Sequence, residues 1–233
     1  MSLPYIEKNL AEVRREIAAA EAGVGRSGQT LMLAAIKYGS DAEVQALLDA
    51  GVRAVGENRV QQLLDRYPLL QAAGAEVHFI GSLQTNKVKY IIDKVKMIHS
   101  VDSLRLATEI EKRAAAKELT VDVLLEINGA REEAKSGVMP EEAEALCRAL
   151  LQMPHLRLRG FMTMGPVFAC KEDYRSYFAS VSAFAGELWS RLALSGQPLL
   201  SMGMSQSFGA AIEAGADMVR VGRRLFQSSE NKQ

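Results

Sequence analysis

The chain has 233 residues, of which 48% are hydrophobic and 24% charged, the composition of an ordinary soluble globular protein. Positive and negative side chains balance at 28 each, so we expect no general electrostatic attraction to nucleic acid or to an anionic membrane. No apolar run approaches the roughly 18 residues that span a bilayer, and the charged, amphipathic N-terminus is typical of a helix and not of a signal peptide.

The cysteines indicate a compartment. Cys147 and Cys170 form no CxxC pair, and without a signal peptide a reducing cytoplasm is the expected location. We therefore predict two free thiols. Cys147 stands at helical spacing from other apolar residues, so we expect its helix to turn it toward the protein core.

Two strand–helix units follow the N-terminal helix. Residues 31–37 (LMLAAIK) form an apolar run that predicts a strand, and Ser40 and Glu43 are placed as a capping box for the helix after it. Residues 54–57 predict a second strand. The helix after this strand is expected to end in the turn before Pro68.

The alternation continues to the end of the chain. Pro140 followed by Glu141 is typical of a helix start, because proline suits the first turn and a carboxylate suits the helix dipole. The remaining strands are predicted at residues 77–82, 97–101, 121–128, 156–164, 199–204 and 217–222, with a long helix over roughly 173–194.

Strands that alternate with helices imply parallel pairing, because each crossover must return to the same edge of the sheet. Eight such units close a barrel, whereas an open doubly wound sheet more often has about five or six strands. We therefore predict an α/β fold: a single (β/α)8 TIM barrel with an extra N-terminal helix, formed by residues 1–233 as one domain.

Reactive groups of such barrels lie at the C-terminal ends of the strands. Lys37 ends the first apolar run and would be desolvated if it pointed into the barrel mouth. Desolvation lowers the pKa of an ammonium and frees the amine to attack aldehydes. The alternative is a lysine at a strand end that simply reaches water.

Two features near the C-terminus suit an anion. Arg220 stands between two valines on a strand, and a buried guanidinium needs a partner, either a structural carboxylate or a ligand. Ser205 could cap a helix that starts near Gln206, or present its hydroxyl beside free amides to a phosphate. Gly222 would let the backbone approach an anion closely.

Two other patterns are rejected as sites. Residues 23–28 match GxGxxG, but they follow a helix and precede a strand, which is the wrong context for a dinucleotide site. His78, His99 and His155 are far apart in sequence and show no metal-ligand spacing, so each is predicted to be a core or surface histidine.

Together these residues resemble the YggS/PROSC family of pyridoxal 5'-phosphate (PLP) homeostasis proteins, which share the alanine racemase N-terminal barrel. The resemblance runs in order over nearly the whole chain. Its segments are LMLAAIK (31–37), VGENRVQQ (55–62), HFIGSLQTNKVK (78–89), IHSVDS (98–103), LLEINGAREEAKSG (124–137), LRGFMTM (158–164), LSMGMSQSF (200–208) and AIEAGADMVRVG (211–222).

The resemblance implies a set of cofactor-binding residues. Lys37 would carry PLP as a Schiff base, and Asn58 would lie beside the cofactor. Ser205 would hold the phosphate together with backbone groups of Gly222 and Arg223.

Arg220 would face the pyridine nitrogen. An arginine has a pKa above about 12 and does not give its proton to the ring, so the ring nitrogen stays unprotonated and is a weaker electron sink than one paired with aspartate. Racemases of the related fold use such an arginine too, but they add a second domain that supplies an opposing tyrosine base, and no such domain is expected after the last strand here. The resemblance therefore favours a carrier or regulator over a racemase.

The sequence departs from the family pattern at three places. The stretch 36–40 reads Ile-Lys-Tyr-Gly-Ser where Ser-Lys-Thr-Lys-Pro is usual, so the second lysine is missing. Arg223 replaces a common threonine, and either its guanidinium or only its amide would meet the phosphate. Ser82 replaces a usual histidine.

Lys135 matches a family lysine and is either an acceptor of PLP during transfer or a solvated loop residue.

We therefore predict a non-catalytic PLP-binding protein that buffers the cofactor, delivers it to apo PLP-dependent enzymes, and so influences amino-acid and keto-acid balance. One alternative is a PLP-dependent racemase or aldolase of the same barrel class. Another is a barrel enzyme for a phosphorylated metabolite without a covalent cofactor. A monomer is expected, with a dimer as the alternative.

Overall fold

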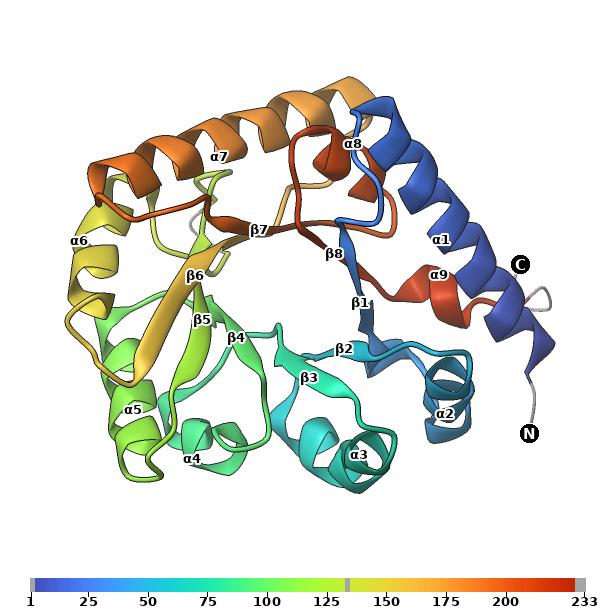
Figure 1. Ribbon diagram of the computed structural model, residues 1–233, viewed down its shortest axis with the longest axis horizontal. Coiled ribbons are helices and arrows are strands. Elements are labelled where there is room, and N and C mark those ends of the chain that lie inside the picture. Colours follow the sequence, from blue (N-terminus) through green and yellow to red (C-terminus); the bar gives the residue numbers. More distant parts are fainter. Residues whose placement is uncertain (1–2, 133–134, 229–233) are drawn as a thin grey trace.

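A computed structural model describes residues 3–132 and 135–228. Its parallel strands form one closed barrel in chain order, with β8 paired back to β1 (Figure 1). The strands are β1 Leu31–Ala35, β2 Ala54–Glu57, β3 Glu76–Phe79, β4 Met97–Val101, β5 Val121–Ile127, β6 Leu156–Thr163, β7 Leu199–Met204 and β8 Met218–Val221. The predicted eight-stranded α/β barrel is confirmed.

Helices surround the barrel (Figure 1). They are α1 Pro4–Gly23, α2 Asp41–Asp49, α3 Val60–Ala72, α4 Val88–Ile91, α5 Leu104–Ala115, α6 Pro140–Leu150, α7 Lys171–Arg191, α8 Phe208–Glu213 and α9 Arg223–Phe226, with 3-10 turns η1 Ile36–Tyr38 and η2 Thr85–Lys87. The predicted capping box of α2 is confirmed at Ser40 and Glu43. Within the described ranges, no helix combines the length and apolar character needed to cross a bilayer.

The extra N-terminal helix is also confirmed. Helix α1 buries Ile6 and Leu10 on one face and lies beside α8 and α9 (Figure 1). Helix α8 has only 6 residues, and α1 packs against it. The Asn9 amide donates to the carbonyls of Leu225 at 3.2 Å and Gln227 at 2.9 Å, which ties both ends of the chain together.

Helix α3 does not end where the sequence predicted. It continues through Pro68 to Ala72, so the expected end before Pro68 is wrong. Proline lacks an N–H and leaves the preceding turn one hydrogen bond short. Leu63 and Leu70, both 0% exposed, lie on either side of Pro68, and burial of Leu70 offsets the lost bond.

The glycine-rich stretch 23–28 binds a carboxylate of its own chain. Glu21, only 3% exposed, accepts hydrogen bonds from the backbone amides of Gly28 (2.8 Å), Gln29 (2.9 Å) and Thr30 (2.6 Å). Gly28 reaches this arrangement with a φ of +63°, which favours glycine. Burial raises the pKa of Glu21, but these hydrogen bonds prevail and hold that pKa below its ordinary value.

We expect Glu21→Gln to destabilise the protein by about 1–3 kcal/mol, because an amide NH2 would face amides that also donate. The pKa of Glu21 is lower in the folded than in the unfolded chain. The wild-type advantage is therefore full above the ordinary carboxyl pKa and disappears as pH falls through the folded value. Urea unfolding at about pH 7 and about pH 3 measures both effects. Glu187→Gln, at an exposed position of α7, is the matched control; equal effects of the two changes would contradict the prediction.

Candidate functional site

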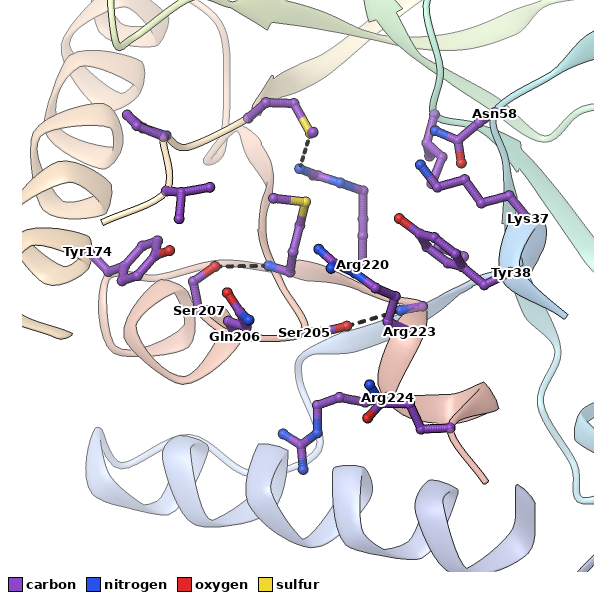
Figure 2. Close-up of a pocket in the computed structure, with 18 residues that line it drawn as sticks. Lys37, Tyr38, Asn58, Tyr174, Ser205, Gln206, Ser207, Arg220, Arg223 and Arg224 are labelled. Carbon is purple, nitrogen blue, oxygen red and sulfur yellow. Dashed lines mark hydrogen bonds between the residues drawn. The ribbon is translucent and has the colours of Figure 1, made fainter. Parts of the chain in front are cut away.

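A pocket of about 240 Å³ opens at the C-terminal end of the barrel (Figure 2). The structure brings all six predicted cofactor-binding residues to it, from β1, β2, β7, β8 and the turns that follow them. These residues are Lys37, Asn58, Ser205, Arg220, Gly222 and Arg223. Their shared position is a finding, while their role toward a cofactor stays a prediction.

Lys37 lies on the rim of this pocket. The chain leaves β1 at Ala35 and turns through η1, so the side chain of Lys37 is exposed and its Nζ lies 4.9 Å from the centre of the Tyr38 ring. Of the two interpretations left open by the sequence, the structure shows the lysine that reaches water, because the strand ends two residues earlier than expected. The amine nevertheless projects into the pocket, beside Asn58 (Figure 2).

One arginine of α3 fixes the turn that carries Lys37. Arg66 donates to the carbonyls of Ile36 at 2.7 Å and Gly39 at 2.5 Å, on either side of Lys37. It also contacts the carboxylate of Glu57 at 3.3 Å. Glu57 is 0% exposed, and burial raises its pKa while Arg66 lowers it. The turn is therefore attached to the end of β2 through a single guanidinium.

Asn58 follows β2 and carries an unsatisfied group. Its side-chain Oδ1 is buried without a hydrogen-bond partner among the described residues. A Cβ at Gly81 would lie 2.2 Å from the backbone oxygen of Asn58, so only glycine permits this close approach. Buried polar atoms normally have partners, and Oδ1 is thus an acceptor available to a bound ligand.

Ser205 and Gly222 adjoin each other in the lining of the pocket. The amide of Gly222 donates to Ser205 Oγ at 3.3 Å. A Cβ at Gly222 would lie 2.8 Å from the Tyr38 ring, so a larger residue would displace that ring. Ser205 is not the helix cap considered from the sequence, because α8 starts three residues later and its N-cap residue is Ser207.

Arg220 lies at the floor of the pocket and is only 4% exposed. Its NH1 donates to the carbonyl of Ser201 at 2.7 Å and to its Oγ at 2.8 Å, and its NH2 donates to the carbonyl of Thr163 at 2.8 Å. The sequence predicted a carboxylate or a ligand as partner, whereas the structure shows carbonyls and a hydroxyl. Burial lowers the pKa of Arg220 to about 10, with Glu126 opposing the shift, so the group stays cationic near neutrality.

The sequence reasoning missed several lining residues. Tyr38, Tyr174, Gln206 and Arg224 also line the pocket, and the loop after β6 brings further apolar groups. Arg224 points toward α1, where its NH1 donates to Glu16 at 2.7 Å (Figure 2). The Tyr38 and Arg224 side chains adjoin predicted site residues in sequence, which was the signal available. No carboxylate is among the lining residues in the described part of the chain, so the pocket suits an anion.

Comparisons with known proteins identify this barrel. Residues 5–230 match the family model described as "Alanine racemase, N-terminal domain", so the chain has the barrel of that class. A protein of Aquifex aeolicus named "Pyridoxal phosphate homeostasis protein" is 44% identical over 183 residues, which cover 78% of this chain and 80% of that one. An Escherichia coli protein of the same name is 36% identical over 226 residues, 95% of each chain.

A solved structure agrees with these relatives. PipY of Synechococcus elongatus, determined with PLP bound, is 28% identical and superposes with a TM-score of 0.84, covering 95% of this chain and 100% of PipY. This chain belongs to the family of pyridoxal phosphate homeostasis proteins. The predicted family is confirmed.

Proposed function

We propose that this protein binds PLP in the pocket, holds it as a Schiff base on Lys37, and serves in intracellular PLP homeostasis. One observation carries the proposal. The amine of Lys37, the half-buried hydroxyl of Ser205 and the buried guanidinium of Arg220 converge on one pocket, together with two further arginines. Among the described residues, no carboxylate lines this pocket. The relatives named above and the PLP-bound PipY structure support it.

The residues present fit PLP group by group. The amine of Lys37 can condense with the aldehyde, releasing water and forming an imine. Ser205 and the backbone at Gly222 and Arg223 offer a hydroxyl and amides for the phosphate, and the cations add charge complementarity. Arg220 offers a permanent cation to the pyridine nitrogen. The unpartnered Oδ1 of Asn58 provides an acceptor nearby.

The site suits a carrier of PLP better than a PLP-dependent enzyme. The side chain of Lys37 is exposed, so water reaches the reactive amine and allows a Schiff base to form and hydrolyse reversibly. Carbanion chemistry benefits from exclusion of water and from a protonated ring nitrogen, and Arg220 does not protonate the ring. We therefore propose a non-catalytic buffer that supplies PLP to apo PLP-dependent enzymes, in place of a racemase or aldolase.

We also propose a domain organisation, a location and an oligomeric state for the protein. Residues 1–233 would form a single PLP-binding domain, active in the cytoplasm. The protein would be a monomer, and sedimentation analysis of the PLP-loaded form distinguishes this from a dimer.

The absorption spectrum of the purified protein after incubation with PLP tests the function directly. A visible band, retained after dialysis and removed by borohydride with a reduced PLP adduct at Lys37 in the peptide map, is the expected result. A colourless protein with no adduct would favour the barrel enzyme for a phosphorylated metabolite. Chiral chromatography of L- and D-amino acids incubated with the loaded protein tests the racemase, and turnover lost in Lys37→Ala would overturn the carrier.

We expect Arg66→Lys to weaken PLP binding about tenfold, because one ammonium cannot bridge both carbonyls that flank Lys37. Equilibrium dialysis with absorbance detection measures the affinity. Arg113→Lys, at a surface ion pair of α5, keeps the same chemical change away from the pocket and should leave affinity unchanged. Unaltered affinity in Arg66→Lys would show that the turn is held by other contacts.

A further inference from the structure

A line of buried polar side chains crosses the barrel beneath the pocket. Arg220 NH1 lies 2.8 Å from Ser201 Oγ, which lies 3.0 Å from His99 Nδ1. His99 Nε2 in turn lies 2.9 Å from His78 Nδ1. His78 is 2% exposed and both His99 and Ser201 are 0% exposed. Strands β3 and β4, which carry the histidines, lie across the barrel from β7 and β8, so this polar line spans the interior (Figure 1).

Apolar residues share the barrel interior with the polar line. Met97 and Met218 stand two residues before His99 and Arg220 on the same strands. They belong to a buried cluster with Leu124 and Met162. Polar groups in such surroundings are costly unless they are hydrogen-bonded to one another. The groups of the line therefore depend on one another for their hydrogen bonds.

Both histidines of the line are neutral. Burial, followed by the charge of Lys96, lowers the pKa of His78 to about 4. Burial, followed by His78 and Arg220, lowers the pKa of His99 well below its ordinary value. Each ring therefore carries one N–H and one bare nitrogen, and the hydrogen bonds between them must have a direction.

The hydrogen-bond inventory favours one direction. Arg220 only donates, so Ser201 Oγ accepts from it, and the Ser201 hydroxyl can donate to His99 Nδ1. His99 Nε2–H then donates to His78, which leaves only His78 Nε2 without a partner among the described residues. The opposite direction would leave the Ser201 hydroxyl hydrogen unpaired as well.

This direction turns the acceptor end of each group toward Arg220. A cation polarises such a chain of hydrogen bonds and is stabilised by it. The charge of Glu126 also favours the cation, but among the described residues its carboxylate makes no hydrogen bond to Arg220. His99 thereby fixes the Ser201 oxygen that holds NH1. With NH1 and NH2 occupied by Ser201 and Thr163, the orientation of the whole guanidinium is set from below the pocket.

We propose that His99 is a positioning residue of the cofactor site, which acts through Ser201 to hold Arg220 cationic and correctly oriented toward the pocket. This inference rests on the proposed PLP function, and adds to it a residue that does not line the pocket. It predicts that His99 affects PLP only by way of Arg220.

The test is a double-mutant cycle read by PLP affinity and by the visible absorption maximum of the loaded protein. His99→Leu removes the acceptor and should weaken PLP binding about three- to tenfold and shift the maximum. His99→Asn keeps an amide oxygen near the position of Nδ1 and should restore both. In an Arg220→Lys background, His99→Leu should change affinity by less than about twofold, because the two residues act as one unit.

Competition between inorganic phosphate and PLP distinguishes this positioning role from a general disruption of the pocket. His99→Leu should leave the inhibition constant of phosphate unchanged, since Ser205 and Gly222 lie outside the polar line. If His99→Leu does not fold, Ser201→Ala cuts the same link by removing one hydroxyl and should give the same result.

Three outcomes would overturn the inference. These are wild-type affinity and spectrum in His99→Leu, additive effects in the Arg220→Lys background, or an equal loss of phosphate and PLP binding. Failure of the proposed function looks different, because the wild-type protein itself would then show no visible band and no adduct at Lys37.

Discussion

Lys37→Ala is expected to abolish covalent PLP attachment, so that no borohydride-reduced adduct forms at this position and the visible band disappears. The substitution removes the only amine that the structure places in the lining of the pocket, within the described ranges. Noncovalent contacts of Ser205, Gly222 and the cations remain, and we expect them to retain PLP with an affinity lower by about two to three orders of magnitude. Equilibrium dialysis and difference spectra measure the two effects.

Lys37→Arg is the matched control, because it keeps a cation at the rim but cannot form an imine with an aldehyde. It should also lose the adduct, yet bind PLP more tightly than the alanine variant through its charge. The exposed Lys135, whose Nζ lies 2.8 Å from Glu132 Oε1, is the competing amine. An adduct that maps to Lys135 in the wild-type protein would contradict the assignment to Lys37.

The fold was predictable because its signals are local and repeated. Apolar runs with the length of strands alternate with capped helices, and a capping box such as Ser40–Glu43 depends only on residues three apart. Alternation then dictates parallel pairing and closure. One exception was Pro68, where local propensity argued for a helix end and burial of Leu70 favoured continuation of the helix.

The sequence was enough to predict which residues line the pocket, but not which contacts they make. Residues at the C-terminal ends of barrel strands converge whatever their neighbours, so the pocket could be assembled from the sequence. The orientation of Lys37 depends on a 3-10 turn held by Arg66, which lies in α3, beyond the next strand, and no local pattern reveals it. His78 and His99 appeared isolated because strand register, not sequence spacing, brings their rings together.

Arg220→Glu should destabilise the PLP-free protein strongly, whatever its function. The guanidinium donates hydrogen bonds to the Ser201 carbonyl, the Ser201 hydroxyl and the Thr163 carbonyl. An ionised carboxylate has no hydrogen to donate, so its oxygens would repel the two carbonyl oxygens. Breaking a buried charged network costs about 3–5 kcal/mol. For a chain of this size, that lowers the midpoint of thermal unfolding by about 10 °C. Calorimetry without PLP measures it.

Arg223→Glu makes the same chemical change at an exposed position beside the pocket, and we expect a shift of less than about 2 °C. The pH dependence distinguishes a buried carboxylate from a simple loss of packing. In the Arg220→Glu variant, burial raises the folded-state pKa of the introduced carboxyl above its unfolded value, so protonation favours the folded variant. The deficit relative to wild type should therefore be smaller at about pH 5 than at about pH 8. A deficit that does not change with pH would mean that the carboxylate escapes to water, and that the floor of the pocket is less closed than the 4% exposure of Arg220 indicates.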